Sequence, residues 1–180
     1  METIDYQKQA QDFLEKTGVT FKAEFLEFGK YFEDDKHARL IFKITLEKGS
    51  RKYSFNFGTS LKTTEDFFIY LIDKTTYWDY MDWKKHFKYP ARVIKDEEVL
   101  KHLIPLISKH KEKINAPSAY DVLACLTKYD PDTFEEFCYS YGYDTDSRKA
   151  EKIYKAVCEE WVNVQKIWTD SEIEEMQEIQ

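Results

Sequence analysis

The spacing of apolar residues changes from the period of a helix to the period of a strand within the first third of the chain. In the segment 4–16 apolar side chains recur at roughly helical intervals, and Thr17-Gly18 then supplies a stop, so the segment predicts a helix. Over 19–29 apolar and polar residues alternate, which is typical of a strand with one buried face. Two later stretches alternate in the same way on either side of Lys48-Gly49, a dipeptide that indicates a tight turn. Three strands with short links predict an antiparallel meander whose aromatic face needs a cover.

The middle of the chain gives weaker signals. The apolar run 66–72 is compatible with a buried strand or with a helix, and we interpret it as a helix. Asp96 can cap a further helix that extends to Ile104. Pro105 is expected to break or kink this helix, because proline lacks the backbone N–H that a helix interior needs. The residues 115–118 then indicate a short hinge.

Two short helices are predicted directly after the hinge. Ser118 is a suitable cap for a helix over 119–127. Pro131 fits the first position of the next helix, and Gly142 supplies its stop. The buried face of this second helix is expected to consist of Phe134, Phe137, Cys138 and Tyr141.

The longest helix of the chain is predicted over 146–168, where apolar residues recur every three or four positions along the whole segment. Thr169 and Glu172 have the spacing of a capping box, which predicts a final helix over 170–179 with an exposed acidic side. We expect the apolar stripe of the long helix to be buried against the other C-terminal helices; it consists of Ala150, Ile153, Tyr154, Val157, Trp161, Val164 and Trp168.

These elements together predict an α+β protein. Its parts are an N-terminal helix, a three-stranded antiparallel meander with an aromatic cover, and a C-terminal helical subdomain. We expect an α+β body over 1–116 and an acidic helical subdomain over 117–180.

The negative charge of the chain is concentrated in its last third. The segment 117–180 holds 15 acidic and 6 basic residues, a net charge of -9, whereas 1–116 holds 19 and 21, a net charge of +2. Such a face can present carboxylates to a basic groove as nucleic acid presents phosphates, or it can merely keep the protein soluble. The candidate partner-binding face consists of Asp130, Asp132, Glu135, Glu136, Asp144, Asp146, Glu172, Glu174, Glu175 and Glu178.

Three stretches of the chain resemble a group of small accessory proteins from phages and prophages. They are FKAEFLEFGKYFEDD near Phe21, RKYSFNFG near Arg51, and the segment from AYDVLACLTKYDPDTFEEFCYSYGYDTDSRKAEKIYKAVCEEW to the terminal acidic helix. The resemblance assigns no catalytic residues. It implies a setting in an infected bacterial cell, and in size, charge and setting the chain is similar to anti-CRISPR and other anti-defence inhibitors.

We therefore expect a non-enzymatic inhibitor that binds a host defence protein, possible targets being the nucleic-acid-guided nucleases. The alternative is a single-stranded nucleic-acid binding module, because basic and aromatic residues interleave in one stretch, although cover of the meander is the favoured interpretation of these aromatics. This basic-aromatic patch consists of Trp83, Lys84, Lys85, Phe87, Lys88 and Tyr89.

Candidate catalytic and metal chemistry is weak in this sequence. The four histidines are scattered without an HExxH motif, and the three cysteines lack CxxC spacing, so they are expected to be free and buried. Asp144, Asp146 and Ser147 begin like a calcium loop but lack its glycine, and helix capping explains them better. We expect no cofactor, no metal and no enzymatic activity. No apolar run has the length of a membrane span, so a location in the host cytoplasm is expected.

Overall fold

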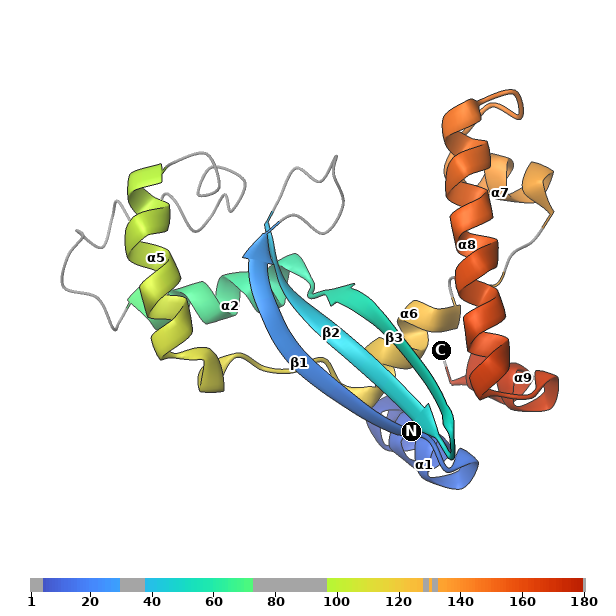
Figure 1. Ribbon diagram of the computed structural model, residues 1–180, viewed down its shortest axis with the longest axis horizontal. Helices are drawn as coiled ribbons and strands as arrows, with labels where there is room; N and C mark the ends of the chain where they lie inside the picture. The colour runs from blue at the N-terminus through green and yellow to red at the C-terminus, as the bar shows by residue number, and fades with distance from the viewer. Residues whose placement is uncertain (1–4, 30–37, 73–96, 128–129, 131–132, 180) are drawn as a thin grey trace. The chain divides into compact units, whose positions relative to one another are not determined.

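The computed structural model describes residues 5–29, 38–72, 97–127, 130 and 133–179. It confirms the α+β prediction: an N-terminal helix, a three-stranded antiparallel sheet in the order β1-β2-β3, and C-terminal helices (Figure 1). The first elements are α1 (Tyr6–Thr17), β1 (Thr20–Gly29), β2 (Arg39–Lys48), β3 (Arg51–Gly58) and α2 (Leu61–Ile72). The later elements are α5 (Glu97–Lys109), the 3-10 turn η1 (Lys111–Lys113), α6 (Ala119–Leu126), α7 (Phe134–Tyr141), α8 (Arg148–Ile167) and α9 (Asp170–Glu178).

The chain divides into two compact units, and each is described here by itself. Unit 1 consists of Met1–Lys22, Thr45–Ser54 and Ser118–Gln180, and unit 2 consists of Ala23–Ile44 and Phe55–Pro117. The C-terminal helices therefore belong to the same unit as the N-terminal helix and the tip of the β2–β3 hairpin.

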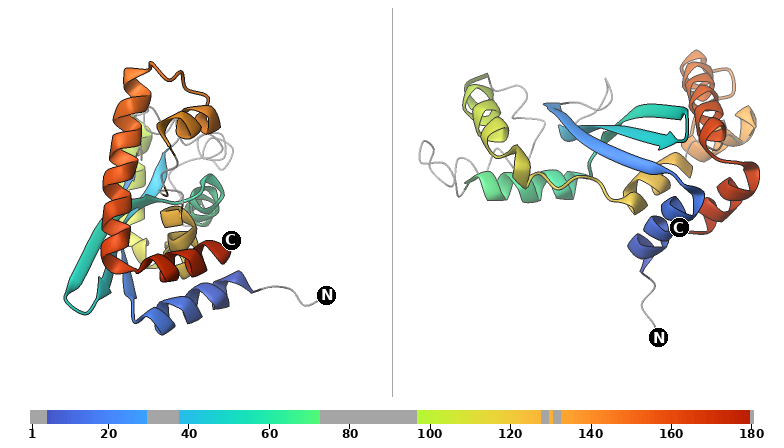
Figure 2. Two further views of the ribbon diagram at one scale, coloured as in Figure 1. Left: turned by 90° about the vertical axis from the view of Figure 1, so that its right-hand side faces the viewer. Right: turned by 60° about the horizontal axis from the view of Figure 1, so that its bottom comes forward.

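In unit 1 the N-terminal helix packs against α6 and α9, and α9 lies beside α1 (Figure 2). The face of α1 that is buried carries Ala10, Phe13 and Leu14. From α6 and α9 this core receives side chains that are also almost fully buried, namely Val122, Leu123, Leu126, Ile173 and Met176. Burial of these apolar groups is the main stabilising term for this unit.

The hairpin tip in unit 1 confirms the predicted turn at Lys48-Gly49. Gly49 adopts a φ of +61°, a backbone conformation that glycine reaches without the steric cost of a Cβ atom. Two cross-strand pairs on the exposed face fix the register: the hydroxyls of Thr45 and Ser54 lie 3.1 Å apart, and Nζ of Lys52 lies 2.8 Å from Oε1 of Glu47.

In unit 2 the buried parts of the strands are aromatic and aliphatic. The rings of Phe28 and Phe68 meet edge to face with centroids 4.9 Å apart, and Phe25 and Phe42 meet in the same way at 5.7 Å. Phe68 lies on α2, which confirms the helical interpretation of 66–72. The predicted aromatic cover from residues 77–89 lies outside the described residues.

Two predicted helix boundaries differ in the structure. Of the break or kink expected at Pro105, the break does not occur: the helix α5 continues through Pro105 to Lys109, and the N–H of His110 reaches the carbonyl of Leu106 at 3.0 Å. The helix α7 begins at Phe134 rather than at Pro131, since Thr133 supplies the cap through a hydrogen bond to the N–H of Glu136.

The apolar stripe of α8 is buried less completely than its periodicity predicts. Ala150, Val164 and Trp168 are buried, but Ile153, Tyr154, Val157 and Trp161 are only half-buried. Ile153, Tyr154 and Val157 pack against the small cluster of Phe137, Cys138 and Ala150, where the short helix α7 covers them only in part (Figures 1 and 2). Burial of the cysteines is likewise partial, because Cys138 is buried whereas Cys125 and Cys158 are half-buried; all three are free.

Candidate partner-binding surface

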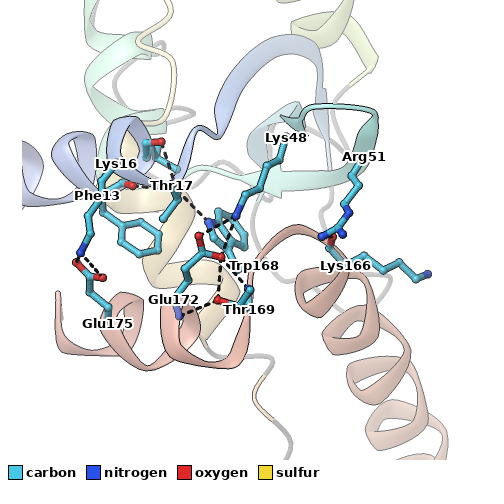
Figure 3. Close-up of polar contacts among 11 residues, drawn as sticks. Phe13, Lys16, Thr17, Lys48, Arg51, Lys166, Trp168, Thr169, Glu172 and Glu175 are labelled. Carbon is cyan, nitrogen blue, oxygen red and sulfur yellow. Dashed lines mark hydrogen bonds and ion pairs between the residues drawn. The ribbon is translucent and has the colours of Figure 1, made fainter.

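Two acidic residues of the predicted partner-binding face connect α9 to the rest of unit 1 through ion pairs. Nζ of Lys48 donates to both carboxylate oxygens of Glu172, at 2.8 and 2.9 Å, and Nζ of Lys16 donates to both of Glu175, at 2.7 and 2.8 Å (Figure 3). Both carboxylates were expected on the exposed side of α9; this was wrong for Glu172, whose side chain is 24% exposed, whereas the side chain of Glu175 is still 41% exposed. Contacts across the fold, rather than the helix period, decide their exposure.

Glu172 has a second structural role at the start of α9. Its Oε2 accepts from the backbone N–H of Thr169 at 2.8 Å and from the Thr169 hydroxyl at 3.1 Å, which confirms the predicted capping box. Burial opposes ionisation of this carboxyl, but the hydrogen bonds from Lys48 and Thr169 outweigh it and hold the pKa of Glu172 below its ordinary value.

This lowered pKa predicts a loss of stability in acid. A carboxyl with a lowered folded-state pKa stabilises the fold above its unfolded-state pKa, and the stabilisation disappears as the pH falls through the folded-state pKa. We expect Glu172→Gln to cost about 1 kcal/mol at pH 7 and progressively less below about pH 4, as measured by urea unfolding. The exposed Glu174→Gln is the control and should cost almost nothing at any pH. A Glu172→Gln cost that stays constant from neutral pH into acid would contradict this assignment.

The helix α7 is held in place by its caps and by aromatic packing. Oε2 of Glu136 accepts from the N–H of Thr133 at 3.0 Å and from its hydroxyl at 2.8 Å, and these hydrogen bonds lower the pKa of Glu136. At the other end Gly142 takes a φ of +68°, and the N–H of Tyr143 bonds to the carbonyl of Cys138 at 2.9 Å. The ring of Phe137 packs on Tyr154 of α8 with centroids 5.4 Å apart. The helix therefore presents its remaining side chains from a fixed scaffold.

Cys138 lies in the small apolar cluster between α7 and α8, with Phe137 and Ala150. Burial, together with the nearby charge of Asp144, raises the pKa of its thiol. The thiol therefore stays protonated at neutral pH, and Cys138 has a packing role.

The other carboxylates of the predicted partner-binding face differ in their hydrogen-bond partners and in their exposure. Oδ2 of Asp130 accepts from Nε2 of Gln177 at 2.5 Å, and Asp132 lies outside the described residues. Five carboxylates are exposed and make no side-chain hydrogen bond or ion pair with any described residue; they are Glu135, Asp144, Asp146, Glu174 and Glu178. Of these, Glu135 lies in the first turn of α7, and Asp144 and Asp146 lie in the loop between α7 and α8. We call Glu135, Glu136, Asp144 and Asp146 the α7 carboxylates.

Two exposed tyrosines accompany the α7 carboxylates. Tyr139 is 91% exposed, and Tyr141 is 60% exposed although the sequence placed it on the buried face. A shallow hollow of about 480 Å³ on α7, largely open to solvent, is lined by Glu135, Glu136, Tyr139 and Ser140. Sequence reasoning missed Tyr139; its position off the predicted apolar face was the available signal.

The segment after the hinge is less uniformly acidic than its net charge indicates. The first half of α8 carries four exposed basic residues, Arg148, Lys149, Lys152 and Lys155. The negative charge is therefore divided between α7 with its following loop and α9, with a basic stretch between them along the chain. Glu172 and Glu175 are neutralised by ion pairs, whereas the α7 carboxylates, Glu174 and Glu178 form no ion pair with the described residues.

The other chemical candidates add little. The basic-aromatic patch of Trp83, Lys84, Lys85, Phe87, Lys88 and Tyr89 lies outside the described residues. Within the described ranges, no three histidine, cysteine, aspartate or glutamate side chains are grouped closely enough to hold a metal ion. None of the helices that the structure describes combines the length and apolar character needed to cross a membrane.

Comparison of the chain with protein-family models, with curated proteins and with solved structures found no match. The case for a function therefore rests on the residues of this chain and on their geometry.

Proposed function

We propose that this chain is a non-enzymatic phage accessory protein that binds and inhibits a host defence protein through the α7 carboxylates. The observation that supports the proposal is that some acidic residues form ion pairs within unit 1 and others do not. Glu172 and Glu175 form ion pairs with lysines of unit 1, whereas Glu135, Asp144 and Asp146 are exposed and make no side-chain hydrogen bond or ion pair with the described residues.

Helix electrostatics explain part of this arrangement. Glu135 lies in the first turn of α7, and Asp144 and Asp146 precede the first turn of α8, so all three lie near the positive end of a helix dipole. At exposed sites each such charge contributes about 0.3–1 kcal/mol to helix stability. That role does not account for Tyr139, whose ring is left almost wholly in water beside Glu135 and Glu136. Tyrosine is enriched at protein-binding surfaces and among the residues that contribute most to binding.

A basic target fits this surface best. Carboxylates on a fixed scaffold attract a positively charged groove at long range and accelerate encounter with it. Proteins that handle nucleic acids have such grooves, because they must neutralise phosphates. The class of host defence protein that fits is therefore one with a basic nucleic-acid groove, such as a nucleic-acid-guided nuclease.

Affinity capture in the bacterium that carries the phage or prophage tests this function. We expect the tagged chain to retain a basic nucleic-acid-binding protein and to inhibit it. The neutral variant Glu135→Gln, Asp144→Asn, Asp146→Asn should retain much less, with Glu159→Gln, Glu174→Gln, Glu178→Gln as a matched control of three exposed carboxylates elsewhere in unit 1. Equal capture by both variants would contradict a role for the α7 carboxylates.

A further inference from the structure

The hollow on α7 joins one exposed ring to two carboxylates. Tyr139 follows Glu135 by four positions and Glu136 by three, and residues at these spacings are neighbours on a helix surface. Phe137 and Cys138 are buried in the cluster with α8, so the hollow lies on the part of α7 that α8 leaves uncovered. Its side chains are available to a partner.

The hydrogen-bonding groups of the hollow are acceptors. Both capping bonds of Glu136 use Oε2, so Oε1 makes no hydrogen bond with the described residues, and neither do the two oxygens of Glu135. The ring of Tyr139 has a negative face that attracts cations. A ligand that offers several N–H donors, a positive charge and a flat surface satisfies all three groups together.

We propose that this hollow binds an arginine side chain of a basic protein segment, with the guanidinium stacked on Tyr139 and hydrogen-bonded to Glu135 and Glu136. This rests on the proposed function and names the subsite at which the partner is anchored. Arginine fits better than lysine because its guanidinium is planar, carries five donors in a fixed fork and stacks on aromatic rings, whereas an ammonium is a strongly hydrated point charge. Nucleic acid does not fit, because its phosphates would meet two carboxylates.

Titration of the full chain with hexa-arginine and hexa-lysine peptides, followed by calorimetry and NMR, tests the subsite. We expect hexa-arginine to bind at least about three-fold more tightly and to shift the resonances of Glu135, Glu136 and Tyr139. Tyr139→Ala should weaken hexa-arginine binding about five-fold and remove most of the preference over lysine, while Tyr139→Phe, which keeps the ring, should retain both. Tyr139 is 91% exposed, so neither change should affect folding.

Tyr141→Ala is the matched control, since Tyr141 is also exposed but does not line the hollow. It should leave the arginine preference unchanged. Equal binding of the two peptides, unaffected by Tyr139→Ala, would show only general attraction to a chain of net charge -7 and would overturn the proposal. Dimerisation that Tyr139→Ala abolishes would also overturn it, because the occupant would then be a second copy, whose α8 carries exposed bases.

The two proposals fail separately. If the neutral variant of Glu135, Asp144 and Asp146 loses the captured host protein but Tyr139→Ala binds it as tightly as the parent, the arginine subsite is wrong and the proposed function stands. If neither variant changes capture, the proposed function itself is wrong.

Discussion

Trp168→Ala is expected to destabilise unit 1 by about 3–5 kcal/mol, the range for removal of a large aromatic side chain from a core. Trp168 is 1% exposed and comes directly after α8, where the chain turns into α9. Its ring lies 6.2 Å from that of Phe13, and its Nε1–H donates to the Thr17 hydroxyl at 3.3 Å (Figure 3). One side chain therefore joins the α8–α9 corner to α1. The measurement is urea unfolding followed by circular dichroism.

Trp161→Ala provides the comparison, because it removes the same side chain from the same apolar stripe. Trp161 is only half-buried, so its loss should cost about 1–2 kcal/mol. Trp168→Phe should cost less than Trp168→Ala, since it keeps a six-membered aromatic ring in the core and removes the pyrrole part of the indole with its hydrogen bond to Thr17. Equal costs for the two alanine variants would mean that the stripe is buried evenly and that this account of the α8–α9 corner is wrong.

Local signals in the sequence predicted much of unit 1. Ser118 and Thr169 cap the helices that follow them, because a cap depends on residues only three positions apart. The alternation in the strands and the glycine of the Gly49 turn are equally local, and the sheet follows from them. These features depend on residues that are close together in the chain, so they can be predicted from one sequence.

Features that depend on distant partners could not be predicted. Glu172 and Glu174 are both acidic residues of the same helix, and Glu174 is exposed. Glu172 is half-buried because Nζ of Lys48, 124 positions earlier in the chain, lies 2.8 Å from its Oε1. Trp161 and Trp168 belong to one helical stripe, but Trp168, which meets α1, is 1% exposed, whereas Trp161 is only half-buried. The helical period shows that a residue is on the apolar face and does not show how far a neighbouring helix reaches along that face.

The same limit applies to the candidate site. Net charge placed the acidity in the last third of the chain, and the residues of the α7 carboxylates were all named from the sequence. What the sequence could not supply was their division into carboxylates that stabilise the fold and carboxylates that remain exposed. Tyr139 was missed although it lies off the predicted apolar face of α7, because an aromatic residue is ordinarily expected to be buried.

This division changes how the acidic surface should be tested. Reversing Glu136 would break the capping box of α7, so a loss of binding in that variant would be ambiguous. Glu135→Lys, Asp144→Lys, Asp146→Lys avoids the cap and should lower the rate of association with the captured host protein about ten-fold or more at low ionic strength. Surface plasmon resonance measures this rate, and circular dichroism must first show that the helices persist, because lysines near the starts of α7 and α8 oppose the helix dipoles.

The position of the charge, rather than its amount, is expected to decide the result. Glu159→Lys, Glu174→Lys, Glu178→Lys changes the net charge equally at exposed sites on α8 and α9, and its effect on the association rate should be several-fold smaller. The effects of both triple variants on the association rate should shrink as added salt brings the Debye length to about 8 Å and below. The difference between the two variants should persist longest in the dissociation rate, because short-range contacts dominate that rate. If the two triple variants slow association equally, only the overall field of the chain attracts the partner, and the binding surface lies away from α7.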